Sequence, residues 1–83
     1  MPRFYFHLQN QVDARDEEGR EVADLEEATA AARSDILSIL SDDVSRGRID
    51  LRGRIDIADE TGTILRTVAF ADAVQLRLPG DPQ

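Results

Sequence analysis

Two acidic stretches of the chain nearly repeat each other and hold residue types that could bind a metal ion. The segments DARDEEGR at 13–20 and DIADETGT at 56–63 share the pattern Asp-x-x-Asp-Glu-x-Gly. A calcium loop of the EF-hand type needs oxygen ligands at alternate positions, a glycine at position six and a glutamate at position twelve. Neither segment has that spacing. The pattern favours two turns, in which an aspartate accepts backbone N–H groups and the glycine adopts the left-handed conformation.

The turn interpretation also predicts which strand residues face each other. If Asp59 faces Thr63 across the second turn, Asp56 lies opposite Arg66. If Asp16 faces Arg20 across the first turn, Arg15 lies opposite Glu21. Opposite charges that face each other across two antiparallel strands are favourable, so we expect each turn to join a short hairpin.

Two further groups of side chains could react with or bind a ligand. His7 has an unperturbed pKa near neutrality and could act as a general base. No motif sets a serine or cysteine beside it, which favours a surface or interface position. Four arginines could bind phosphate: Arg46, Arg48, Arg52 and Arg54. Asp50 and Asp56 interleave with them and no aromatic side chain does, which favours a solvated face over a platform for stacked bases.

The composition limits the classes of protein to which the chain could belong. It has 83 residues, no cysteine and one histidine, which excludes disulfides and thiolate or histidine-rich metal sites within one chain. Its net charge of −7 repels nucleic acid over long range. No stretch approaches the roughly 20 apolar residues of a membrane span, and the N-terminus lacks the features of a signal peptide. We therefore expect a cytoplasmic protein with no metal, no cofactor and no membrane contact.

Three segments alternate with the period of a β-strand and would carry these side chains. They lie at 3–8, 49–59 and 63–71. In the first of them, RFYFHL, Tyr5 and His7 lie on the face opposite to the two phenylalanines. With a short strand beside the first turn, these segments predict two hairpins.

One long amphipathic helix is predicted between the hairpins, at 24–43. Asp24 is a favourable N-cap, and Glu27 follows three residues later as in a capping box. Gly47 offers a left-handed C-cap. At about 100° per residue, the apolar side chains of the helix fall within one arc. The members of this arc are Leu25, Ala28, Ala32, Ile36, Ile39 and Leu40.

These elements predict a single α+β domain over residues 1–78, in the order ββαββ. The helix would pack on one face of a mainly antiparallel sheet. Residues 79–83 are expected to form a disordered tail.

One helix covers only one face of a sheet, so apolar residues on the other face would mark an association surface. If Ile55 and Ile57 face the helix, the predicted register and the alternation of the strands place five residues on the opposite, open face of the sheet. These predicted interface residues are Tyr5, His7, Ile64, Val68 and Phe70. We expect a homodimer that forms through the open face or edge of the sheet. The segment DAVQLRL at 72–78 is the alternative cover from within the chain.

Three segments of the chain resemble a known family: RFYFHL, DEEGREVADLEEA and RIDIADETGTILRTVAFADAV. The family consists of small bacterial proteins, mainly alphaproteobacterial, described as a domain of unknown function. The resemblance extends to about Leu76 and implies a single small domain, with no activity to carry over. The sequence thus favours a non-enzymatic interaction module. The alternative is a nucleic-acid or phosphate-binding regulator that uses the four arginines, and an enzyme ranks last.

Overall fold

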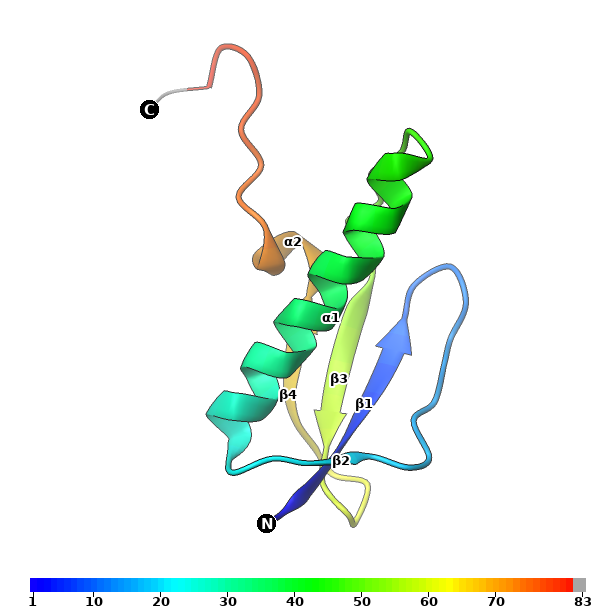
Figure 1. Cartoon of the computed structure of the whole chain (residues 1–83), viewed down its shortest axis with the longest axis vertical. Helices are drawn as coiled ribbons and strands as arrows, with labels where there is room; N and C mark the ends of the chain where they lie inside the picture. The colour runs from blue at the N-terminus through cyan, green and yellow to red at the C-terminus, as the bar shows by residue number, and fades with distance from the viewer. Residues whose placement is uncertain (82–83) are drawn as a thin grey trace.

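A computed structural model describes residues 1–81, which form a four-stranded antiparallel sheet crossed by one long helix (Figure 1). The elements in chain order are β1 (Arg3–Gln9), β2 (Arg20–Glu21), α1 (Leu25–Ser45), β3 (Arg54–Ala58), β4 (Ile64–Ala69) and α2 (Phe70–Ala73). The strands lie in the order β2-β1-β3-β4, so β1 and β3 are central. The predicted α+β fold is confirmed, with α2 as an additional helical turn.

The alternation of β1 decides which of its side chains enter the core. Phe4 and Phe6 are buried in the main hydrophobic cluster, whereas Tyr5 between them lies on the opposite face. Arg20 of β2 stacks on the ring of Phe6, with its guanidinium carbon 4.1 Å from the ring centroid. The same guanidinium forms an ion pair with Asp35 of α1. Arg20 thus covers one side of the core and connects β2 to the helix.

The helix α1 begins and ends as its caps predict. The Asp24 carboxylate accepts the N–H of Glu27 at 2.8 Å, a contact worth about 1 kcal/mol. After the helix ends at Ser45, Gly47 has a φ of 84°, and its N–H donates to the Val44 carbonyl at 2.9 Å. Four members of the predicted apolar arc are buried: Ala28, Ala32, Ile36 and Leu40.

A β-bulge in β4 overturns the predicted register of the second hairpin. The predicted pairing holds for Asp59 with Thr63 and for Ala58 with Ile64, after which Leu65 is an extra residue and the register shifts. A shift of one residue moves every later side chain to the other face of a strand. Val68 consequently lies opposite Ile55 and faces the core rather than the open side of the sheet.

Two of the five predicted interface residues are therefore wrong. Val68 and Phe70 belong to the hydrophobic core, and Phe70 is among its largest fully buried side chains. The ring of Phe70 packs against Gly53, where an added Cβ would lie 2.9 Å from the ring. The other three predicted interface residues remain on the open face of the sheet, which is opposite to α1: Tyr5, His7 and Ile64.

The first acidic turn docks onto β1 instead of forming a hairpin of its own, so that prediction is wrong. β2 pairs with the start of β1, and Ala14 forms a bridge with Leu8 near its end. Asp16 holds the turn in place: its carboxylate accepts the N–H of Phe6 at 3.1 Å. In return, the N–H of Asp16 donates to Nδ1 of His7, also at 3.1 Å. Both sides of the turn therefore run along β1.

The chain after α2 leaves the domain rather than covering the open face of the sheet. Figure 1 shows this segment running away from the sheet, at the end of the molecule where α1 also ends. Val74 packs against the core, but Leu76 and Leu78 are 54% and 56% exposed. The expected cover by this segment is therefore wrong for the two leucines.

The predicted disordered tail, 79–83, is described only as far as Asp81. The N–H of Asp81 donates to the Leu78 carbonyl at 3.0 Å, and its carboxylate accepts the Leu78 N–H at 2.9 Å. Residues 82–83 lie outside the described residues. Within residues 1–81, neither helix has the length and apolar character needed to cross a membrane.

Candidate functional site

The open face of the sheet carries a buried carboxylate at its centre. Asp56 of β3 is only 4% exposed. It accepts hydrogen bonds from Thr67 Oγ1 at 2.8 Å, Arg54 Nε at 3.3 Å and Gln9 Nε2 at 3.4 Å. Burial of a carboxylate is costly unless donors surround it. The three donors come from β4, β3 and β1, so Asp56 connects three strands.

The bulge also decides the partner of Asp56, and the predicted pair with Arg66 is wrong. Thr67 lies opposite Asp56 in the shifted register. Arg66 instead reaches α1, where its Nη1 donates to Glu26 Oε1 at 3.0 Å and to Thr29 Oγ1 at 3.1 Å. An aspartate in the middle of an apolar strand was the available signal for a buried carboxylate.

His7 lies next to Asp56 on the open face, directly opposite in the register of β1 and β3. Its Nδ1 accepts the N–H of Asp16, so the neutral ring carries its proton on Nε2. The ring is half-buried and holds the first acidic turn against β1. The prediction that His7 lies on the face of the strand opposite to the two phenylalanines is confirmed. Its hydrogen bond with Asp16 is a structural contact.

In both acidic segments the second aspartate holds a turn by accepting backbone N–H groups that follow it. The Asp16 carboxylate accepts the N–H groups of Glu18 at 3.1 Å and Gly19 at 3.0 Å. The Asp59 carboxylate accepts the N–H groups of the residues two and four positions later, at 2.9 and 3.0 Å. The closing glycines have φ angles of 71° and 88°. The prediction of two turns with left-handed glycines is confirmed.

These hydrogen bonds change the acidity of both aspartates. Partial burial raises the pKa of Asp16, but the N–H groups of Gly19, Phe6 and Glu18 outweigh it and lower that pKa below its usual value. The Thr61 hydroxyl, which donates at 2.6 Å, and the backbone N–H groups lower the pKa of Asp59. Both carboxylates are thus ionised and engaged in holding their turns.

Both turns border one shallow hollow of about 340 Å³, which also includes His7. Its acidic lining consists of Asp16, Glu17, Asp59 and Glu60. In the part of the chain that the structure describes, no group of three or more acidic, histidine or cysteine side chains could hold a metal ion. The hollow therefore marks where the two turns meet and provides no chelating geometry.

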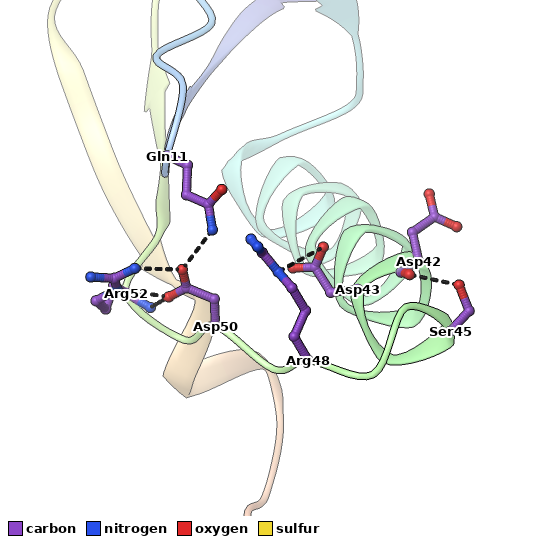
Figure 2. A network of polar contacts seen from close by, with 7 residues as sticks. All are labelled: Gln11, Asp42, Asp43, Ser45, Arg48, Asp50 and Arg52. Atoms are coloured by element: carbon purple, nitrogen blue, oxygen red, sulfur yellow. Dashed lines mark hydrogen bonds and ion pairs between the residues drawn. The ribbon is translucent and has the colours of Figure 1, made fainter.

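Three of the four predicted anion-binding arginines are engaged by carboxylates. Figure 2 shows Arg52 beside Asp50, to which its Nε and Nη2 donate at 2.9 and 2.8 Å. Gln11 Nε2 donates to the same carboxylate at 3.0 Å. Arg48 Nε lies 4.0 Å from Asp43 Oδ1, at the end of α1 (Figure 2). The Arg52–Asp50 pair lies within the segment between α1 and β3. The other two contacts join this segment to Gln11 and to the end of α1.

This pairing leaves the arginines poorly arranged for phosphate. The Arg52 guanidinium and then Gln11 hold the pKa of Asp50 far below its usual range, so the pair stays charged. Arg54 donates to the buried Asp56. The four arginines also divide between two hollows: Arg46 and Arg48 line one, and Arg52 and Arg54 line the other. They lie near one another but do not converge on one anion site.

The two edges of the sheet differ in how well they are protected. β2 has only two residues, Arg20 and Glu21, and both are charged. β4 has six residues and begins with Ile64 and Leu65, which are 56% and 42% exposed. Proteins protect edge strands by shortness and by charge. β2 is protected in both ways, whereas β4 is neither short nor charged at its start.

The hydrogen-bond pattern identifies the groups that β4 presents at its edge. The N–H of Phe70 donates to the Gly53 carbonyl at 2.9 Å. In antiparallel pairs, inward and outward backbone groups alternate along the strand. Val68 therefore bonds inward, and the N–H and C=O of Thr67 and the N–H of Ala69 point outward. The C=O of Ala69, the N-cap of α2, accepts the first hydrogen bond of that helix. The edge thus offers donors and acceptors to another strand.

A family model matches residues 3–71 of the chain, that of a domain of unknown function (DUF6894). No curated protein and no solved structure matches. The matched residues include the sheet, α1 and the start of α2, and they end before the C-terminal segment.

Proposed function

We propose that this chain, which belongs to the DUF6894 family of unknown function, is a small non-enzymatic interaction module that binds a second copy of itself through the edge of β4. The observation that carries the proposal is the β4 edge, the longer of the two edges of the sheet, which begins with the exposed Ile64 and Leu65. A strand of this kind is a ready template for another strand.

A two-fold antiparallel contact between two β4 strands fits the edge. The outward groups of Thr67 and Ala69 in one copy would bond to those of the other, and one sheet would continue into the next. Such a contact uses the same patch on both copies, as two-fold dimers do. Burial of the exposed Ile64 and Leu65 would add about 25 cal/mol per Å² of apolar surface removed from water.

The chemistry of the open face favours association through the edge over association through the face. Val68 and Phe70, the apolar residues expected on this face, lie in the core. What remains at its centre is the hydrogen-bonded Asp56, next to the half-buried His7. Both side chains are engaged in structural hydrogen bonds, which supports a binding role rather than catalysis.

Phosphate or nucleic-acid binding receives less support. Three of the four candidate arginines already contact a carboxylate, in the pairs Arg48–Asp43, Arg52–Asp50 and Arg54–Asp56. The net charge of −7 opposes approach to a polyanion.

The substitution Ala69→Pro tests the proposal without disturbing the fold. Ala69 has a φ of −78°, which proline adopts, and its N–H points outward, so proline removes no bond to β3. The variant Ala69→Ser keeps the N–H and is the matched control. Sedimentation equilibrium at micromolar concentration should give twice the 9.2 kDa of one chain for the wild type and the control. Ala69→Pro should be monomeric, and a dimeric Ala69→Pro or a monomeric wild type would overturn the proposal.

A further inference from the structure

The segment at 74–78, here called the arm, has the alternating pattern of a strand but is part of no sheet within residues 1–81. It follows α2 in extended conformation, with φ −130° and ψ 156° at Val74. Its apolar residues alternate with Gln75 and Arg77. More than half of the surface of Leu76 and of Leu78 is exposed within the chain. An apolar stripe of this kind needs a surface to cover.

The exposed apolar residues of β4 lie at the opposite end of the same molecule. Ile64 and Leu65 begin β4 next to the β3–β4 turn, whereas the arm starts beyond its last residue, Ala69 (Figure 1). At about 3.3 Å per residue, the two ends of β4 are roughly 17 Å apart. Since the arm runs away from the sheet, it does not cover Ile64 and Leu65 of its own chain.

We infer that the arm of one copy covers Ile64 and Leu65 of the second copy, and that the two arms clasp the dimer. The inference rests on the proposed β4 contact. Antiparallel pairing of two β4 strands brings the last residue of one strand next to the first residues of the other. The arm follows after the short helix α2 and runs on past the same end of β4 (Figure 1), so it is delivered to the partner's exposed Ile64 and Leu65 rather than to its own.

The charges of the two surfaces are complementary. Arg77 lies between the two leucines of the arm. The β3–β4 turn, which directly precedes the apolar pair Ile64 and Leu65, carries Asp59 and Glu60. The arm thus meets acidic and apolar side chains in the same region of the partner. The arm lies beyond residues 3–71, the part of the chain that the family model matches.

The variant Leu76→Ser/Leu78→Ser tests the clasp through the strength of the dimer. Both leucines are exposed in a single chain, so the fold of the variant should be unchanged by circular dichroism. The dissociation constant should rise tenfold or more in sedimentation equilibrium. Leu37→Ser removes an exposed leucine from α1 and should leave that constant unchanged.

Cross-linking identifies the surface on which the arm lies. The natural chain has no cysteine, so the single variants Leu76→Cys and Leu65→Cys can be mixed, one with a mass tag, and oxidised. A disulfide between the two variants can form only between chains. The mixed product should form faster than in a mixture of Leu76→Cys with Leu37→Cys, which sets the background rate.

The outcomes separate the clasp from the edge contact. A weakened serine variant together with fast cross-linking of positions 76 and 65 supports the clasp. An unchanged dissociation constant, or cross-linking at the background rate, overturns the clasp while a dimer that Ala69→Pro abolishes stays in place. A monomeric wild type overturns both proposals at once.

Discussion

The two acidic turns should respond differently to the same substitution. Gly19 and Gly62 both have positive φ, of 71° and 88°. A Cβ at Gly62 would meet nothing within 4 Å. A Cβ at Gly19 would lie 2.8 Å from the carbonyl oxygen of Phe4 and 2.9 Å from Cγ of Arg3. The glycine of the first turn is packed on β1, whereas a side chain at the glycine of the second turn would enter open space.

The expected costs follow from these surroundings. Gly62→Ala places an alanine in the left-handed region and should cost about 1–2 kcal/mol of unfolding free energy. Gly19→Ala carries that cost and adds overpacking against the backbone of β1, worth about 1–3 kcal/mol. The total for Gly19→Ala is therefore about 2–5 kcal/mol. Gly47→Ala, at φ 84° with nothing within 4 Å, should match Gly62→Ala.

Urea unfolding with linear extrapolation measures the difference. The three alanine variants are made in the Ala69→Pro background, so that dimer dissociation does not enter the unfolding free energy. An equal cost at Gly19 and Gly62 would refute the reasoning, because it would mean that the first turn does not pack against β1.

Three further predictions concern the helix and the turns. Ile36→Ala should cost about 2–5 kcal/mol because Ile36 is fully buried, whereas Ser38→Ala should be neutral in urea unfolding; equal costs would mean that α1 is rotated. The Thr61 hydroxyl and the backbone lower the pKa of folded Asp59, so its contribution to stability is present above the unfolded pKa of about 4 and is lost as pH falls through the folded pKa. Acid titration of Thr61→Ala should show a smaller loss than the wild type, and identical curves would contradict this. Millimolar calcium or magnesium should leave the melting temperature unchanged because the turn aspartates are engaged; a saturable rise would contradict the turn interpretation.

The fold was predictable because local signals agreed with one another. Alternation in 3–8 predicted β1, and Asp24 with Glu27 predicted the start of α1. Gly47 and Gly62 had the positive φ angles that their positions required. Each of these features depends on residues close together in the sequence.

Which residues of β4 lie on the open face of the sheet was not predictable, because it depends on one extra residue. The segment TILRTVAFA has apolar residues at both alternations, so the core accepts either register and the pattern does not reveal the bulge at Leu65. That single residue moves Val68 into the core and sets Thr67 opposite Asp56. The docking of the first turn likewise depends on a contact between Asp16 and Phe6, ten residues apart.

Amide hydrogen exchange at β4 tests the central claim most directly. In a single chain, the N–H groups of Thr67 and Ala69 point to the open edge of the sheet. The N–H groups of Val68 and Phe70 bond inward, to β3 and to Gly53 just before it. Measured by NMR across a concentration series, Thr67 and Ala69 should become protected as the dimer forms, while Val68 and Phe70 stay protected throughout. Fast exchange of Thr67 and Ala69 at concentrations where the protein is dimeric would show that the copies associate elsewhere, and would contradict the account.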